Sequence, residues 1–376
     1  MKILVLTSST GGGHDMRARA LREWAARAAD AEAVVHQALE DAHGLYRFGV
    51  GFYNFIQKNC PALHHVYFNF LEVAGMCRSS RRMLGKKKFQ RVLKETRPDV
   101  IVSVHGTLNH GFFELARAVL KDVKCVTYCG ELFGGYGFSK HWVNPQADLF
   151  IGAVDETCQA AADWGMPLER IWSGGFLLRP AFWAGSWREQ ERDQFVEKEL
   201  GFDPRQFLLV LGTGAMGANC HLRFLNALWK AGVRSQVLAL CGRSKRTLAE
   251  VKGWARLHSG FPVKAMAYTD DMPRILGAAS AIVARPGTGT TSEAILSGCP
   301  LIFNGLGGVM PQEGITVKFC RKYGLGQMAR RARDLPVIVA EWMRHPERLE
   351  EIRRRMAEIR PKNHPLNIFE KLAELT

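Results

Sequence analysis

Short apolar runs alternate with longer stretches of helical character along the first half of the chain. The runs at Ile3–Thr7, Val100–Val104, Val123–Thr127 and Leu149–Ala153 are rich in aliphatic and β-branched residues, and they predict buried strands. The Ala- and Arg-rich segment Met16–Ala29 predicts the first of the helices between them. This alternation is typical of a parallel sheet that is covered by helices on both faces.

The second half of the chain begins the same pattern again. Phe207–Leu211 predicts a strand, Gly212–Ala218 a glycine-rich loop and His221–Ala231 a helix. Further strands are predicted at Val237–Leu240, Val263–Ala267, Ala281–Ala284 and Leu301–Phe303. We therefore predict an α/β fold of two Rossmann-like domains that face a cleft, with the ligand at the carboxyl ends of the strands.

A domain boundary is expected near Leu178–Arg188, where Arg179-Pro180 and the segment that begins at Trp183 interrupt the periodicity. The first domain is expected to comprise residues 1–180 and the second residues 181–360, and a short segment, residues 361–376, follows them. Asn367–Leu375 in that last segment predicts a further helix.

Composition places the chain among folded globular proteins. Of its 376 residues, 47% are hydrophobic and 23% are charged, which excludes the disordered and fibrous classes. No apolar run reaches the roughly 18 residues that a membrane-spanning helix needs. The start, Met1–Asp15, predicts a buried strand that leads into a glycine-rich loop rather than a secretory signal. Nine cysteines without a Cys-x-x-Cys pair indicate a reducing compartment, and Cys125 and Cys129 lack a second pair to complete a metal site.

Net charge is the first unusual feature. The chain has 51 basic and 36 acidic residues, and the net charge of +15 favours an anionic partner such as nucleic acid, a phosphorylated ligand or an acidic membrane. Nine basic residues gather between Met76 and Arg97 against one acid, Glu95. This basic cluster consists of Arg78, Arg81, Arg82, Lys86, Lys87, Lys88, Arg91, Lys94 and Arg97.

An aromatic segment, Leu45–Met76, directly precedes the basic cluster. Its aromatic residues are Tyr46, Phe48, Phe52, Tyr53, Phe55, Tyr67, Phe68 and Phe70. Aromatic rings followed by cations are typical of an element that binds at a bilayer interface, where each cation near an anionic surface contributes roughly 1 kcal/mol. The alternative is a helical lid that packs on its own domain beside a solvated basic face.

The first glycine-rich loop, Gly11–Gly13, is followed directly by His14. Glycines let a backbone approach a ligand closely, and the N-terminus of the next helix favours an anion or developing negative charge. The loop does not match the G-x-G-x-x-G pattern, which argues against a dinucleotide site. A histidine at this position is placed to act as a general base, although a lone histidine is more often structural.

Two more glycine-rich loops follow in the second half. Gly212–Gly217 is able to cradle a phosphate through its backbone N–H groups, but it lacks the Lys-Ser/Thr ending of a P-loop, which argues against ATP hydrolysis. Arg285–Glu293 follows a predicted strand and opens a helix, a placement that suits a diphosphate, with Glu293 able to accept from ribose hydroxyls. A capping box of Thr290 and Glu293 is the alternative.

Four segments together resemble the GT-B glycosyltransferases that use UDP-sugars, namely Gly11–His14, Pro286–Glu293, Gly298–Pro300 and Pro311–Glu313. The chain is similar in particular to monogalactosyldiacylglycerol synthases and bacterial processive diacylglycerol glucosyltransferases. It is similar more distantly to the transferase that adds N-acetylglucosamine to lipid-linked muramyl-pentapeptide. The resemblance implies a GT-B fold in which residues 1–180 bind the acceptor and the membrane, residues 181–360 bind the UDP-sugar, and residues 361–376 form a helix that crosses back to the first domain.

The resemblance also implies roles for individual residues. His14 would deprotonate the acceptor hydroxyl, and Glu131 would support that base or orient the acceptor. The donor would be bound by Gly13, Gly214, Ala267, Tyr268, Gly287, Thr288, Gly289, Thr290, Glu293, Gln312 and Glu313. The membrane and the lipid would meet Phe52, Tyr53, Phe55, Arg81, Arg82, Lys86, Lys87 and Lys88. Thr288, Thr316 and the pair Gly130-Glu131 depart from the family pattern.

The resemblance predicts an inverting transfer of a hexose from a UDP-sugar to a diacylglycerol-type membrane lipid, which gives a β-glycolipid without a cofactor or a metal ion. The sequence has no Asp-x-Asp site for a divalent ion, and Asp270-Asp271 predicts a helix cap. The enzyme is expected in the cytoplasm, peripheral on the inner face of the cell membrane, with no nucleic-acid partner. Three alternatives stay open: a polyprenyl-linked or other amphiphilic acceptor, a sugar-nucleotide epimerase, and a non-enzymatic binder of anionic membranes or nucleic acid.

Overall fold

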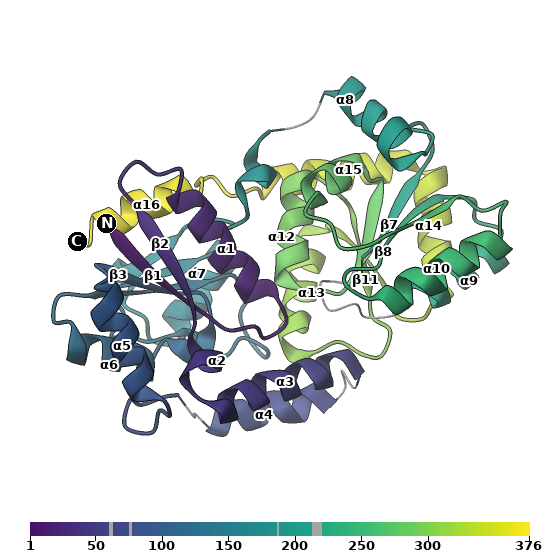
Figure 1. Cartoon of the computed structure of the whole chain (residues 1–376). Coiled ribbons are helices and arrows are strands. Elements are labelled where there is room, and N and C mark those ends of the chain that lie inside the picture. Colours follow the sequence, from purple (N-terminus) through teal and green to yellow (C-terminus); the bar gives the residue numbers. More distant parts are fainter. Residues whose placement is uncertain (60–62, 75–76, 186–187, 213–219) are drawn as a thin grey trace. The chain divides into compact units, whose positions relative to one another are not determined.

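Two compact units make up the chain in a computed structural model that describes residues 1–59, 63–74, 77–185, 188–212 and 220–376 (Figure 1). Unit 1 comprises residues 1–180 together with residues 310–316 and 361–376. Unit 2 comprises residues 181–309 and 317–360. A short stretch of the second half of the chain, residues 310–316, therefore belongs with the first half.

Unit 1 is built on a six-stranded parallel sheet with the strand order β2-β1-β3-β4-β5-β6. Its strands are β1 (Lys2–Thr7), β2 (Glu32–Gln37), β3 (Val100–Ser103), β4 (Lys124–Cys129), β5 (Leu149–Gly152) and β6 (Ile171–Ser173). Almost every residue of β1, β3, β4 and β5 is buried, as expected for strands covered on both faces. The four strands predicted in this half are confirmed, whereas the half-buried edge strands β2 and β6 were not predicted.

Helices cover both faces of this sheet (Figure 1). The helices of this unit are α1 (Gly13–Ala25), α2 (Ala38–Ala42), α3 (Gly44–Asn59), α4 (His64–Ala74), α5 (Lys86–Thr96), α6 (Gly111–Val119), α7 (Asp155–Asp163) and α16 (Leu366–Ala373). Of these, α3 and α4 lie away from the faces of the sheet (Figure 1). The first helix begins at Gly13 rather than at Met16, because Gly12 adopts a left-handed φ of 80° and serves as its N-cap. His14 therefore lies inside the first turn of α1 and not in the loop.

Unit 2 repeats the architecture with the strand order β12-β11-β10-β7-β8-β9, again all parallel. The strands are β7 (Leu208–Gly212), β8 (Gln236–Leu240), β9 (Val263–Met266), β10 (Ala281–Ala284), β11 (Leu301–Asn304) and β12 (Gly326–Ala329). The helices are α8 (Glu189–Gln194), α9 (His221–Lys230), α10 (Lys245–Leu257), α11 (Met272–Ala278), α12 (Thr288–Ser297), α13 (Pro311–Tyr323), α14 (Asp334–Arg344) and α15 (Pro346–Glu358). The prediction of two Rossmann-like sheets is confirmed, and only β12 was missed here.

The C-terminal segment crosses back to unit 1, as the GT-B resemblance implied. Ile368, Phe369 and Leu372 on α16 are buried, and the Asn363 side chain donates to the backbone oxygen of Ser173 at 2.7 Å. The His364 ring packs edge-on against Trp24 of α1, with ring centroids 4.7 Å apart.

Each sheet has one point at which the strand order reverses. In unit 1 this point lies between β1 and β3, and in unit 2 it lies between β7 and β10. Loops that leave two such neighbouring strands run in opposite directions, which leaves a crevice for a ligand outside their carboxyl ends. The glycine-rich loop before His14 leaves β1, and the loop Arg285–Gly287 leaves β10, so both lie at switch points.

Candidate active site

Side chains from three helices hold the glycine-rich loop between β1 and α1. Gly11 and Gly12 have φ angles of 76° and 80°, a conformation that favours glycine. Asn54 of α3 bonds the loop twice: its Oδ1 accepts from the Gly11 N–H at 3.0 Å, and its Nδ2 donates to the Ser9 oxygen at 2.9 Å. Glu40 of α2 accepts from the Ser9 N–H at 2.8 Å, and Asp15 of α1 accepts from the Ser9 hydroxyl at 2.6 Å.

The hydrogen bonding of His14 fixes which of its nitrogens can act as a base. Nδ1 lies 2.7 Å from the backbone oxygen of Val104. A carbonyl oxygen only accepts, so Nδ1 carries the proton in the neutral ring and the lone pair resides on Nε2. Burial and the nearby Arg17 guanidinium lower the pKa of His14 from 6.5 to about 4. At neutral pH His14 is therefore uncharged, and its Nε2 can accept a proton.

His105, which follows β3, contacts His14 and was not among the predicted site residues. The two imidazole centroids are 4.4 Å apart. His105 Nδ1 accepts from the Thr107 N–H at 3.3 Å, so Nε2 carries the proton and donates to the Thr10 hydroxyl at 2.7 Å. Burial holds the pKa of His105 well below its usual range. The side chain thus bonds the glycine-rich loop and packs beside the proposed base without adding a charge.

Arg17 links His14 to Glu131. The Arg17 guanidinium donates to the Gly130 oxygen at 2.8 Å, and its charge lowers the pKa of both His14 and Glu131, so one guanidinium acts on both groups. A Cβ atom on Gly130 would lie 2.0 Å from Arg17 Nε. A side chain at position 130 would therefore collide with Arg17 unless the guanidinium moved.

Glu131 lies at the carboxyl end of β4, one strand away from β3. It is 9% exposed, and no described residue bonds its Oε2. Burial raises the pKa of the Glu131 carboxyl from 4.5 to about 7, while the charge of Arg17 opposes that rise. The carboxyl can therefore exchange a proton close to neutral pH.

Gln312 and Glu313 lie in the first turn of α13, in the stretch that belongs to unit 1. Gln312 Nε2 donates to the Tyr53 hydroxyl of α3 at 2.9 Å, and Glu313 Oε2 accepts from the Met310 N–H at 2.9 Å. Gly137, with a φ of 106°, lets the loop after β4 approach this turn so closely that a Cβ there would lie 2.0 Å from the Pro311 oxygen. Gln312 and Glu313, which the resemblance assigned to the donor site, are therefore positioned by contacts with unit 1, the unit expected to bind the acceptor.

The loop after β10 leads directly into α12 in unit 2. Arg285 donates to the backbone oxygens of Asn304 and Leu306, both at 3.2 Å, which fixes the loop against the end of β11. The helix begins at Thr288, and its N-cap is Gly287, without a side-chain cap. The capping box of Thr290 and Glu293 is therefore wrong.

The first N–H groups of α12 have no acceptor within the helix, so this end favours an anion. Four predicted donor residues lie in its first two turns: Thr288, Gly289, Thr290 and Glu293. A Cβ on Gly287 or Gly289 would meet no atom of the described residues within 4 Å, so the backbone here borders open space. Gly214, a further predicted donor residue, lies outside the described residues.

Two more predicted donor residues, Ala267 and Tyr268, follow β9. The Arg243 guanidinium lies over the Tyr268 ring, 4.8 Å from its centroid. Asp271, predicted to cap the next helix, is the N-cap residue of α11 but makes no side-chain cap, because its carboxylate pairs with Arg274 at 3.1 Å. In the described parts of the chain, no group of three or more His, Cys, Asp or Glu residues could hold a metal ion.

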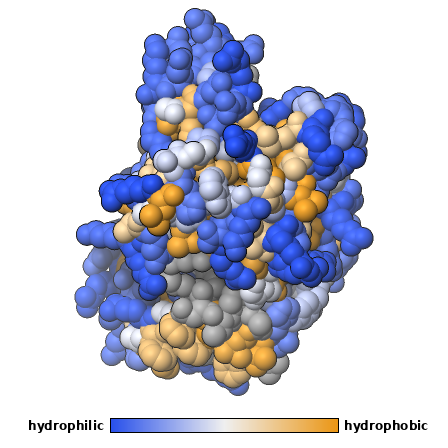
Figure 2. Space-filling model, turned by 90° about the vertical axis from the view of Figure 1, so that its right-hand side faces the viewer, coloured by the Kyte–Doolittle hydropathy of each residue, from blue (hydrophilic) through white to orange (hydrophobic). Residues whose placement is uncertain are grey.

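Helices α3 and α4 expose an apolar surface at the lower edge of Figure 2, the level at which they lie in Figure 1. Its exposed members are Leu45, Phe48, Phe52, Phe55, Leu63, Val66 and Phe70, and we call them the aromatic face. In the next helix, α5, the apolar residues Phe89 and Leu93 are buried. Its lysines Lys87 and Lys88 are exposed, and Lys86 is partly exposed. Arg81 and Arg82, just before the helix, are exposed as well. Among the described residues no helix is long and apolar enough to cross a bilayer.

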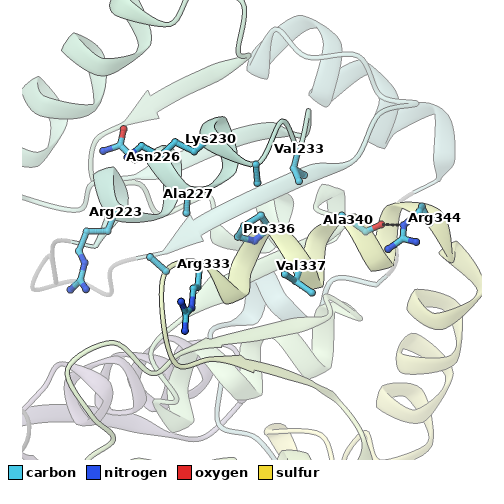
Figure 3. A pocket seen from close by; sticks show the side chains of 12 residues that line it. Arg223, Asn226, Ala227, Lys230, Val233, Arg333, Pro336, Val337, Ala340 and Arg344 are labelled. Atoms are coloured by element: carbon cyan, nitrogen blue, oxygen red, sulfur yellow. Dashed lines mark hydrogen bonds between the residues drawn. The ribbon is translucent and has the colours of Figure 1, made fainter.

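A groove of about 710 Å³ runs between α9 and α14 in unit 2 (Figure 3). Four cations and mainly small apolar residues line it: Arg223, Asn226, Ala227, Lys230, Ala231, Val233, Ala332, Arg333, Pro336, Val337, Ala340 and Arg344. None of the predicted donor residues that the structure describes lines the groove. It is therefore separate from the site predicted from the sequence.

Two known protein families match the two halves of the chain. Residues 14–176 match the family of monogalactosyldiacylglycerol (MGDG) synthases, and residues 208–305 match the glycosyltransferase family 28 C-terminal domain. The chloroplastic monogalactosyldiacylglycerol synthase of Spinacia oleracea is 24% identical over an alignment 364 residues long, which covers 91% of this chain and 66% of that protein. The chain thus spans just under two thirds of the length of this curated relative.

Solved structures share the fold at low sequence identity. MurG of Acinetobacter baumannii is 13% identical and superposes with a TM-score of 0.61, covering 100% of this chain and 99% of its own. UGT89C1 of Arabidopsis thaliana, solved in a complex with UDP, is 14% identical with a TM-score of 0.63 and the same coverage. At such identities the likeness shows the fold alone, and that fold is GT-B.

Proposed function

We propose, from the match of residues 14–176 to the monogalactosyldiacylglycerol synthase family and of residues 208–305 to the glycosyltransferase family 28 C-terminal domain, that this chain transfers a hexose from a UDP-sugar to a diacylglycerol-type membrane lipid and forms a β-glycolipid. One observation carries the proposal. A neutral histidine with its lone pair on Nε2 stands directly after a glycine-rich loop, at the point where the strand order of unit 1 reverses. That arrangement supports proton abstraction from a hydroxyl group.

The proposed step is an in-line displacement. The acceptor oxygen forms a bond to the anomeric carbon on the face opposite the UDP, while the bond between that carbon and the β-phosphate oxygen breaks. His14 Nε2 takes the hydroxyl proton, and UDP leaves with the electron pair. Because the attack comes from the opposite face, an α-linked donor gives a β-linked product.

Protein groups can stabilise the leaving UDP without a metal ion. The N-terminus of α12 offers backbone N–H groups and the positive end of a helix dipole to a diphosphate. The Glu293 carboxylate lies within the first two turns of α12, where it would accept from the ribose hydroxyls. The open space beside Gly287 and Gly289 supports a close approach of the phosphates.

A membrane acceptor is supported by the surface of unit 1. The aromatic face on α3 and α4 lies on the same unit as His14, and cations of the basic cluster follow it in sequence and on α5. Rings at headgroup depth combined with cations suit an anionic bilayer. The enzyme would therefore act as a peripheral protein on the inner face of the cell membrane.

The test is to measure UDP release from a panel of UDP-sugars, with and without phosphatidylglycerol vesicles that contain diacylglycerol. Mass spectrometry of the lipid product names the sugar, and the proton coupling at the anomeric carbon reports its configuration. We expect lipid-dependent release with one donor and a β-linked product. An α-linked product would refute inversion, release without lipid would indicate an epimerase or a soluble acceptor, and no release with any donor would refute the proposal.

A further inference from the structure

Helix α3 is the element on which the aromatic face and the glycine-rich loop meet. Phe48, Phe52 and Phe55 on this helix are 70%, 43% and 60% exposed, and their spacing of four and three residues puts them on one side. Tyr53 and Asn54 are only partly exposed. At about 100° per residue they point well away from the phenylalanine side.

The inward side of α3 reaches two parts of the proposed site. Asn54 bonds the N–H of Gly11 and the oxygen of Ser9, while Tyr53 accepts from Gln312. Both backbone groups belong to the loop that precedes His14, and a glycine-rich loop has more freedom to lose than any other segment. A carboxamide that satisfies one donor and one acceptor of the same loop therefore restricts that loop strongly.

We propose, on the premise of the lipid transferase function above, that Asn54 is a positioning residue through which contact of α3 with the bilayer orders the glycine-rich loop and holds His14 in its reactive place. Glu40 and Asp15 also hold the loop, but they lie on α2 and α1, and among the described residues neither helix carries an exposed large apolar side chain. Within the described part of the chain, α3 is therefore the helix that both bonds the loop and carries part of the aromatic face.

The pKa of His14 should report on the link between α3 and the glycine-rich loop. Its low pKa arises chiefly from burial, so a loosened loop that admits water would raise the pKa from about 4 toward 6.5. The ionisable groups that face His14 are Arg17 on α1 and His105 after β3. Asp15 acts on His105, and Glu131 is coupled to the site through Arg17. None of these residues is substituted in Asn54→Ala. Asp15 and His105 bond the loop, so a shift of the acidic limb of the pH profile would come from the loosened loop and its hydrogen bonds.

The test compares Asn54→Ala with Asn69→Ala, the same substitution at an exposed residue of α4. In Asn54→Ala we expect kcat on vesicles to fall about 10- to 100-fold, the KM for the UDP-sugar to change less than twofold, and the acidic limb of kcat/KM to move up by about one pH unit or more. Vesicle binding should stay unchanged, and Asn69→Ala should behave as the parent protein. An unshifted acidic limb, or a loss of vesicle binding in step with activity, would overturn the proposal.

A second measurement needs neither a variant nor an active enzyme. Deuterium uptake of the loop segment, residues 8–14, and of α3 is compared in the full chain with and without phosphatidylglycerol vesicles. We expect both segments to gain protection together. Protection of α3 with no change in the loop would overturn the coupling even if the transferase function holds, and joint protection would support it even if the acceptor proves to be a different lipid.

Discussion

At the scale of single residues, the reactivity of His14 depends on the Val104 carbonyl and on burial. The carbonyl selects the tautomer, and burial keeps the ring uncharged. Neither contact requires a carboxylate partner, so the proposed base differs from a histidine that a buried aspartate orients. Its activity should therefore persist to unusually low pH.

Replacing His14 with alanine should lower kcat/KM for transfer at least 100-fold, because a positioned general base contributes about 10²- to 10⁴-fold. The affinity for UDP, measured by calorimetry, should change less than twofold. In the parent protein kcat/KM should fall only as the pH drops through about 4, since the protonated ring cannot accept a proton. Transfer at the parental rate in His14→Ala would remove this residue from the mechanism.

For Glu131 we predict an effect on the stability of the folded protein rather than on the reaction rate. Its pKa of about 7 in the folded state lies above the ordinary value of 4.5, so the folded chain retains a proton that the unfolded chain has lost between these values. Ionisation then disfavours folding as the pH rises from about 4.5 to 7, by up to about 3 kcal/mol at 1.4 kcal/mol per pKa unit.

The variant Glu131→Gln lacks that titration. Its free energy of unfolding, from urea curves at pH 5 and pH 8, should rise relative to the parent protein at pH 8 and differ much less at pH 5. An equal difference at both pH values would mean that Glu131 ionises normally in the folded state.

At the scale of elements, Gly137 shows how a loop of the first half positions a turn from the second half. Its φ of 106° is strained for other residues, and a Cβ would also meet the Pro311 oxygen at 2.0 Å. Gly165 has a similar φ of 88°, but apart from its chain neighbours no atom of the described residues lies within 4 Å of where its Cβ would be. Alanine at Gly165 should cost about 1 kcal/mol, which is the backbone strain alone.

Alanine at Gly137 should cost about 2–4 kcal/mol, because overpacking against a backbone oxygen adds to the strain. The turn that moves carries Gln312 and Glu313, so the KM for the UDP-sugar should also rise, whereas Gly165→Ala should leave it unchanged. Urea unfolding and donor saturation curves measure the two effects. Equal unfolding costs at Gly137 and Gly165 would mean that the turn yields without strain.

The two sheets could be predicted because their central strands are continuous apolar runs between breakers, as at Ala281–Ala284. Three of the four edge strands, β2, β6 and β12, could not be predicted, because their residues are mostly half-buried and polar residues interrupt them, and β6 has only three residues. The start of α1 was misjudged for a different reason: a left-handed Gly12 caps the helix without any side chain. Patterns of composition do not record such backbone caps.

His14 was predicted from its neighbours in sequence, whereas its spatial partners were not. His105 and Asn54 reach the glycine-rich loop only because β1 and β3 are adjacent and α3 folds back over the loop. Nothing within a short stretch of sequence marks contacts between residues 11 and 54 or between residues 10 and 105. The family resemblance, now confirmed, supplied Glu131 and Gln312, and Gln312 lies in unit 1 rather than in the predicted donor domain.

At the scale of the whole molecule, the net charge of +15 has to be separated from the placement of the charges. Any strongly basic protein is drawn to an anionic vesicle to some extent. The basic cluster is distinctive because it continues the aromatic face in sequence. The groove in unit 2 is a second cationic surface, with four Lys and Arg residues beside mainly small aliphatic ones. Matched variants at the two places distinguish local binding from overall attraction.

Replacing Lys86, Lys87 and Lys88 with glutamine should weaken binding to phosphatidylglycerol vesicles by up to about 100-fold at low salt, since each cation near the surface contributes roughly 1 kcal/mol. The control replaces Lys230, Arg333 and Arg344 with glutamine, which removes an equal number of positive charges, three, from the groove (Figure 3). We expect the control to lose only a few-fold, and the difference between the variants to shrink as added salt screens the charges. Equal losses of vesicle affinity in the two variants would mean that net charge causes the binding and that the basic cluster is only a solvated face. A loss confined to the Lys86, Lys87 and Lys88 variant would identify α5 as part of the surface that meets the bilayer.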